Sequence, residues 1–567
     1  MDRILKSFVD DFCKSQEILE KDESKKFELF SSYCAIAQQY TEEINVADLV
    51  TGDGNDCGID AMAIIMNGNL VNSKDEVDDI LELNKRISEL TFMFVQAKTS
   101  PNFNYGEIGI FGAGVKDFIS EKPMLKRNNS IEEKRQLVEY IFSNSIKIKK
   151  KPDCYLYYVT TGKWVDDENC LARIKQIETD LKDLFIFDEI KFIPVGANLL
   201  QKYYRNTIDV AEKEICFENK ILLPNIPEVR QSYIGYIEHN EYIKLISNEH
   251  GEINRSIFYD NVRDFQGDNN INRDITTTIQ NNPDIFVLFN NGVTVICKQL
   301  NCIGNRFCLS DYQVVNGCQT SNVIYNCKDS IKSELFIPVK IIETDNDDFI
   351  NGIIKATNRQ TPVRDDQLFA SNEFNRKLEA FYTTFRGNER LYYERRSKQY
   401  RYMNDIEKSR IVSIRTQIKA VSSMFFDKPH LATRFYSKVL NNADLFNINH
   451  SCMPYYLSAF ALYRIDFLIK NQIIPLEYKK FKYFLLMLLK YEIAKNNKCP
   501  TLILKEDNKI YLDMLKVLND DKKLEMYVKD GMDLINKTGI NLNDTETTKS
   551  ASLTVSLIQE VNKIKSK

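Results

Sequence analysis

The sequence has few of the residues from which zinc sites and disulfide frameworks are built. Its 567 residues include four histidines, none within ligand spacing of another, and 13 scattered cysteines without a Cys-x-x-Cys pair. Neither a zinc site nor a disulfide framework is therefore expected, and reduced thiols of a cytoplasmic protein fit this pattern.

Long apolar runs are scarce as well. The run Tyr483–Leu489 is far shorter than the roughly 20 residues that span a bilayer. Near the N-terminus, Asp10 and Asp11 stand where a targeting sequence would need an apolar core. We therefore expect a cytoplasmic protein that makes no membrane contact.

Net charge is also small. A formal value of −4 over the whole chain gives no general attraction to nucleic acid, so any such contact must come from local basic patches. The length predicts two to four domains, each large enough to bury a core of its own.

The most informative segment lies between residues 52 and 100. The apolar runs Ala61–Met66 and Phe92–Val95 are each short enough to be buried strands. Asp60 precedes the first run, and Gln96 and Lys98 follow the second. Side chains alternate along a strand, so Gln96 and Lys98 share one face. If the two strands pair, Asp60 and Lys98 meet at an exposed edge of the sheet.

These groups suit a divalent cation and an attacking water. Mg²⁺ takes hard oxygen ligands and keeps several waters. The Asp60 carboxylate, the Gln96 side chain and the backbone at Ala97 can supply such oxygens. We therefore expect a Mg²⁺ site here, in which Mn²⁺ could also serve.

Asp60 followed by Gln96-x-Lys98 resembles the PD-(D/E)xK nuclease signature in its Q-x-K form. The resemblance implies that Asp60, Gln96 and Ala97 hold the metal and that Lys98 orients the water or stabilises the transition state. It also implies an assisting acid from an N-terminal helix, for which the chain offers Glu28. The alternative from the residues alone is a turn before a core strand and a second strand that ends in an exposed lysine.

The rest of the N-terminal region predicts a layered domain. Two helices before residue 48, the two strands above, a helix over 131–144, a strand over 154–162, a helix over 167–184 and a strand over 190–196 fit a three-layer α/β nuclease core that closes near residue 205. The glycine-rich stretch 106–114 does not have the order of a phosphate loop. We expect it to be a flexible loop that leads into a helix.

The central region, residues 206–420, alternates apolar strands with polar tips. The motifs, in order, are NNPDIFVLFNNGVTVIC, DYQVVNGCQTSNVIYN, FIPVKIIE and IIKATNRQTPVRDDQL. Over about residues 250–420 they resemble the AIPR family, named for abortive infection phage resistance. The resemblance implies an anti-phage defence protein, in which a PD-(D/E)xK-like module precedes the AIPR region.

Two features of this region could contact nucleic acid. Asn316 and Gln319 lie at a polar tip after a predicted strand, where amide groups could pair with base edges; a routine turn is the alternative. A second segment alternates basic side chains, which could contact phosphates, with tyrosines, on which bases could stack. A solvated helix face explains this segment equally well. Its candidate binding residues are Tyr393, Arg395, Arg396, Lys398 and Arg401.

Residues 421–567 have helical spacing throughout. The fold expected is an α/β N-terminal domain (1–205) with a restriction-endonuclease-like core, an α+β central domain (206–420) and a helical C-terminal domain (421–567).

The expected function is a metal-dependent nuclease in abortive infection, with DNA favoured over RNA as substrate and a phage-derived component as a trigger. A homo-oligomer is compatible with the sequence. The alternative is a non-catalytic sensor that binds nucleic acid and has a degenerate nuclease core.

Overall fold

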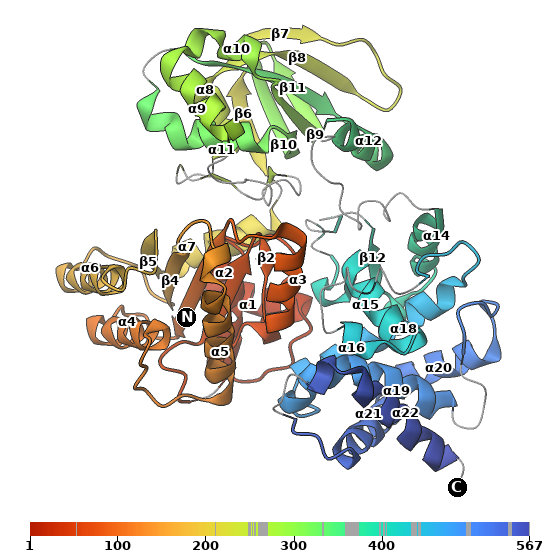
Figure 1. Cartoon of the computed structure of the whole chain (residues 1–567). Coiled ribbons are helices and arrows are strands. Elements are labelled where there is room, and N and C mark those ends of the chain that lie inside the picture. Colours follow the sequence, from red (N-terminus) through yellow and green to blue (C-terminus); the bar gives the residue numbers. More distant parts are fainter. Residues whose placement is uncertain are drawn as a thin grey trace.

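A computed structural model gives the structure of the chain. It describes all residues except 53, 210, 248–250, 252, 255–256, 259–269, 332–333, 358–372, 396–398, 401–402, 404, 433–438, 440–443, 495–499, 543–546 and 566–567. The chain forms three units: a first unit over residues 3–208, a second over 212–357 and a third over 373–565 (Figure 1).

The first unit is built on a five-stranded sheet in the order β2-β1-β3-β4-β5. β1 and β3 are antiparallel, whereas β3, β4 and β5 run parallel. The predicted strand over 61–66 is confirmed to the residue, and the other predicted strands differ at their ends only. The strands are β1 (Ala61–Met66), β2 (Asn69–Leu70), β3 (Leu90–Lys98), β4 (Asp153–Thr160) and β5 (Ile190–Val195).

Both faces of this sheet are covered, so the first unit has three layers. Even-numbered residues of β1, β3 and β4 form one core with α3, α4, α5 and α6, and odd-numbered residues form another with α1, α2 and α7. This is the period of two that a pleated strand imposes. The helices are α1 (Arg3–Ser15), α2 (Glu23–Ile36), α3 (Lys74–Asn84), α4 (Tyr105–Ile119), α5 (Asn129–Ser143), α6 (Glu168–Lys182) and α7 (Ala197–Ile208).

The prediction of a flexible loop over 106–114 is wrong, because these residues lie inside α4. Glycine lowers helix propensity, but packing overrides it here. A Cβ at Gly112 would lie 2.4 Å from Ile177 Cγ1, and one at Gly114 would lie 1.8 Å from the carbonyl oxygen of Cys57. The glycines therefore let α4 approach α6 and the loop before β1.

The second unit is a six-stranded sheet in the order β6-β10-β9-β11-β8-β7. Its helices α8, α9, α10 and α11 share one core with the sheet, and α12 covers part of the other face through Ile354. The elements are β6 (Glu212–Cys216), β7 (Asn219–Leu222), β8 (Gln231–Glu238), α8 (His239–Ile246), α9 (Asn270–Asn281), α10 (Phe286–Phe289), β9 (Val293–Ile303), β10 (Arg306–Asn316), α11 (Cys318–Cys327), β11 (Phe336–Glu343) and α12 (Asp347–Thr357).

The third unit is mainly helical, as predicted, but its core begins earlier than residue 421. Phe374, Tyr393 and Val412 belong to the same core as the C-terminal helices. Residues 373–420 therefore pack with the helical region. The elements are α14 (Glu373–Tyr382), β12 (Tyr392–Glu394), β13 (Ile411–Ser413), α15 (Ile414–Phe425), α16 (Pro429–Ala432), α18 (Cys452–Lys470), α19 (Lys482–Ala494), α20 (Lys509–Asn519), α21 (Asp521–Lys537) and α22 (Ala551–Lys565).

The first and third units lie side by side (Figure 1) and are joined by ion pairs of one polarity. Four such pairs between described residues have the acid on the first unit and the base on the third. They are Glu17–Arg410 at 2.9 Å, Asp48–Lys479 at 2.5 Å, Glu133–Lys480 at 2.5 Å and Asp75–Lys549 at 3.2 Å.

The Glu17–Arg410 pair is well enclosed, with side chains 15% and 13% exposed. Ser409 and Tyr463 also donate hydrogen bonds to the Glu17 carboxylate, at 2.6 and 2.8 Å. Asn471 accepts a hydrogen bond from the Leu19 amide at 2.7 Å. The loop after α1 is therefore held firmly by the third unit.

Within the described part of the chain, no helix combines the length and the apolar character needed to cross a bilayer.

Candidate active site

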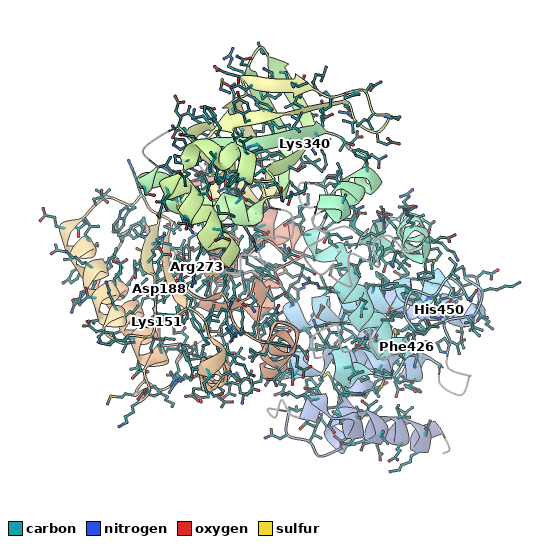
Figure 2. The ribbon with its side chains drawn as sticks, turned by 45° about the horizontal axis from the view of Figure 1, so that its top comes forward. Lys151, Asp188, Arg273, Lys340, Phe426 and His450 are labelled. Carbon is teal, nitrogen blue, oxygen red and sulfur yellow. The ribbon has the colours of Figure 1, made fainter. Side chains whose placement is uncertain are left out.

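The candidate site lies at the edge of the first sheet where β3 ends. Lys151 and Asp188, labelled in Figure 2, mark the opposite edge, close to the starts of β4 and β5. Because β1 runs antiparallel to β3, the residue before β1 and the residues that end β3 meet at one edge.

Two backbone contacts fix Asp60 against β3. Its amide donates to the Val95 carbonyl at 2.9 Å, and its Oδ2 accepts a hydrogen bond from the Ala97 amide at 2.7 Å. Ala61 pairs with Val95, so the antiparallel register places Asp60 opposite Gln96.

Asp60, Gln96 and Lys98 share the face of the sheet that α4 covers. Even-numbered residues of β3 point to this face, which gives Gln96 and Lys98 the phasing that the sequence predicts. Tyr158 on β4 pairs with Gln96 on its other side. Asp60, Gln96 and Tyr158 therefore form a row across three strands, with Lys98 next to it.

Asp60 is more enclosed than the sequence suggested. Its exposed fraction is 9%, whereas an exposed edge was expected. The chain at Thr51 packs along it, and the Thr51 amide donates to the Asp60 carbonyl at 3.1 Å. Burial raises the pKa of the Asp60 carboxyl above its ordinary value, while the Ala97 amide and the Lys98 ammonium act in the opposite direction. A bound cation would favour the ionised form of this carboxyl group.

Gln96 carries a polar atom without a protein partner. Its side chain is 4% exposed, and its Oε1 is buried and accepts no hydrogen bond. Such an atom costs free energy unless a water or an ion satisfies it. An amide oxygen opposite a carboxylate fits Mg²⁺, which prefers oxygen ligands.

The other amide atom of Gln96 is held close to the loop before β1. A Cβ at Gly58 would lie 3.1 Å from Gln96 Nε2, and Gly58 has a φ of +73°. Both the space and the backbone conformation therefore favour glycine at this position.

Glu28 approaches the sheet from the opposite side. It lies half-buried on α2, whose Phe27 and Phe30 pack in the core formed by the odd-numbered strand residues. The Asp60 row faces the other core. The structure thus brings Asp60, Gln96 and Lys98 together and leaves Glu28 outside their row.

Among the described residues, no group of three or more His, Cys, Asp or Glu side chains could hold a metal ion. The metal ligands that the resemblance implies are of other types. They are the Asp60 carboxylate, the Gln96 amide oxygen and the Ala97 backbone oxygen.

Two polar residues of this site, Tyr158 in the row and Glu107 on α4, were not singled out from the sequence. Tyr158 donates a hydrogen bond from its hydroxyl to Glu107 Oε2 on α4, at 2.8 Å. Strand register alone places Tyr158 next to Gln96, and a single sequence carries no direct signal for that register.

The close contact of α4 with the loop before β1 gives a testable expectation. Gly114→Ala places a methyl group 1.8 Å from the Cys57 carbonyl oxygen, so helix and loop must separate. We expect a loss of roughly 2 to 3 kcal/mol in unfolding free energy, measured by denaturant titration.

Gly109→Ala in the same helix is the matched control. Its methyl group would meet the flexible Arg173 side chain at 3.2 Å, and alanine favours the helix by up to about 1 kcal/mol. Equal stability of the two variants would contradict the packing described for α4.

The polar tips of the second unit come together as a pair. Asn290 donates from its side chain to Thr320 Oγ1 at 3.2 Å, which links the turn before β9 to the first turn of α11. Gly317, directly before α11, has a φ of +96°. Asn316 and Gln319 are half-buried on either side of Gly317, and their role in binding stays a prediction.

Part of the predicted basic and aromatic segment is enclosed in the third unit. Arg395 is 5% exposed and pairs with Glu379 at 2.7 Å. Tyr393 is 1% exposed and donates to Asn375 Oδ1. The prediction of phosphate contacts therefore depends on Arg396, Lys398 and Arg401, which lie outside the described residues.

A family model for AIPR protein matches residues 258–545, slightly more than half of the 567-residue chain. The chain belongs to the AIPR family. This AIPR chain matches no curated protein and no solved structure significantly. Membership indicates a role in abortive infection, a defence against phage.

The family match covers most of the second and third units but not the first. The Asp60 site of this AIPR protein therefore lies entirely outside the matched residues. Its chemistry has to be argued from the site itself.

Proposed function

We propose that this AIPR protein is a metal-dependent nuclease that hydrolyses phosphodiester bonds, with DNA as the favoured substrate, during abortive infection. The single observation that carries the proposal is the buried, unpartnered Oε1 of Gln96 opposite the Asp60 carboxylate. Such a pair of oxygens is suited to a divalent cation.

The architecture of the first unit supports the proposal. Helices cover both faces of a mixed sheet, and Asp60 and the Gln96-x-Lys98 residues lie on neighbouring antiparallel strands. We assign this unit a restriction-endonuclease-like core, which the PD-(D/E)xK resemblance implies.

The site residues have separate tasks in the proposed reaction. Asp60, Gln96 and the Ala97 carbonyl would hold Mg²⁺, which polarises the phosphate and lowers the pKa of a bound water. The Ala97 amide fixes Oδ2 of Asp60. The Lys98 ammonium offsets negative charge that develops on the phosphate in the transition state.

The alternative function is a sensor without catalytic activity. It is favoured by glutamine rather than an acid at position 96, which leaves less negative charge for the metal. In that case the polar cluster at Asn316 and Gln319 would bind nucleic acid or a phage component.

One incubation series tests the proposal. Purified protein is mixed with plasmid DNA, single-stranded DNA or RNA, with Mg²⁺, with Mn²⁺ or with EDTA, and with or without extract from phage-infected cells. We expect cleavage with either metal and none with EDTA. A folded protein that cleaves no substrate in any metal-containing arm would refute the nuclease proposal and favour the sensor.

A further inference from the structure

The polar surroundings of the Asp60 site extend beyond the three strands to α4. Asn104 caps this helix by accepting hydrogen bonds from the Gly106 and Glu107 amides. Glu107 therefore lies in the first helical turn, where its negative charge interacts favourably with the helix dipole. Its side chain is half-buried and points to the sheet, because its Oε2 accepts the hydrogen bond from the Tyr158 hydroxyl.

Tyr158 connects Glu107 to the row of site residues. Its side chain is fully buried and its backbone pairs with Gln96, which in turn lies opposite Asp60. The α4 backbone lies near Gln96 of this row, since a Cβ at Gly58 would lie 3.1 Å from Gln96 Nε2 and 3.7 Å from Phe111 Cα. Phe111 follows Glu107 by about one helical turn.

The electrostatics agree with this placement. Burial raises the pKa of the Tyr158 hydroxyl far above its ordinary value, and the hydrogen bond to Glu107 and the charges of Glu107 and Asp60 raise it further. A carboxylate only accepts, so the Tyr158 hydroxyl is the donor in this hydrogen bond. It holds one oxygen of Glu107 in place, and a carboxylate has lone pairs for further partners.

We propose that Glu107, held by the Tyr158 hydroxyl, is the second carboxylate of the Asp60 site and helps it to bind a divalent cation. The unpartnered Gln96 Oε1 belongs to the row between Asp60 and Tyr158, and Tyr158 is the residue that holds Glu107. This inference rests on the proposed function.

The assignment accounts for the glutamine on β3. A metal site of this kind needs enough negative charge to compete with water for Mg²⁺. With Gln96 neutral, α4 supplies that charge from the same face of the sheet. Glu28 is less suited, because α2 packs on the other face.

Metal binding tests the proposal without relying on cleavage. Mn²⁺ affinity is measured by titration with electron paramagnetic resonance for the full-length wild type and for Asp60→Asn, Glu107→Gln and Tyr158→Phe. We expect about 10- to 100-fold weaker binding for Tyr158→Phe, since it removes a partner that orients a ligand, and at least as large a loss for Glu107→Gln. Thermal unfolding of each variant controls for folding.

Glu121→Gln is the matched control, because Glu121 is exposed just beyond the end of α4 and its loss of charge should leave Mn²⁺ affinity unchanged. Weaker binding in Asp60→Asn with wild-type affinity in Glu107→Gln would overturn the role of Glu107 alone. Absence of Mn²⁺ binding in the wild type would overturn the proposed metal site together with this inference. A loss in Glu107→Gln that Glu121→Gln reproduces would reduce the effect to general surface charge and also overturn it.

Discussion

The Asp60→Asn protein is expected to lose cleavage by at least about 1,000-fold, a loss comparable to the removal of a key electrostatic group from other active sites. Asparagine keeps an oxygen that can accept the Ala97 hydrogen bond but removes the charge that binds the metal. Cleavage of labelled DNA under single-turnover conditions provides the measurement.

Asparagine is preferable to alanine at this position because of the burial. Asp60 is 9% exposed, and alanine would leave the Ala97 amide without its acceptor, at a cost of about 1 to 3 kcal/mol. The sequence alone placed Asp60 at an exposed edge of the sheet, where truncation to alanine would cost little stability. With asparagine, loss of activity can be separated from loss of folding.

Lys98→Ala provides the contrast. Lys98 acts on the water or on transition-state charge rather than on the cation, so cleavage should fall sharply while metal affinity changes much less than in Asp60→Asn. If both variants fold and still protect cells against phage as well as the wild type, the nuclease proposal is refuted.

Replacement of Arg410 by alanine is expected to cost about 3 kcal/mol or more of unfolding free energy, because it leaves the Glu17 carboxylate enclosed without its cation. The side chains of Glu17 and Arg410 are only 15% and 13% exposed. Thermal unfolding and hydrogen exchange of the loop after α1 would report the loss.

Lys150→Ala is the control for an ion pair in solvent. Lys150 pairs with Asp188 at 2.9 Å and with Asp153 at 3.3 Å, and its own side chain is more than half exposed, so about 1 kcal/mol or less is expected. Equal effects of Arg410→Ala and Lys150→Ala would show that the two units are not held together at Glu17.

The same contact should depend on pH. Burial acts to raise the pKa of Glu17, but hydrogen bonds from Ser409, Arg410 and Tyr463 outweigh it, so the pKa is lowered from 4.5. The folded state binds this proton more weakly than the unfolded state. The stabilisation that ionised Glu17 gives the folded state is therefore complete above about pH 4.5, and it disappears as the pH falls through the lowered pKa.

The first sheet and the site strands could largely be predicted from the sequence. The apolar run before the Asn67-Gly68 turn is β1 to the residue, and the phasing of Gln96 and Lys98 follows from the strand period alone. Local pattern sufficed because these strands are buried on both faces.

Features that depend on tertiary contacts could not be predicted in this way. The glycines of α4 resemble a loop until their neighbours Ile177 and Cys57 are known. The early start of the third core depends on Phe374 packing with Phe446 and Tyr455, about 70 to 80 residues away. The position of Tyr158 next to Gln96 requires the register of β3 with β4, and its hydrogen bond to Glu107 requires the packing of α4 on the sheet.

The strand order of the second sheet limits how this protein can be dissected. The family match begins at residue 258, after β6, β7 and β8, yet β6 pairs with β10 and β8 pairs with β11. A chain that started at the first matched residue would leave both β10 and β11 as bare edges, which are prone to aggregation. The residues matched by the family model therefore do not form an independent folding unit. Chimeras between relatives should have their junction before residue 212.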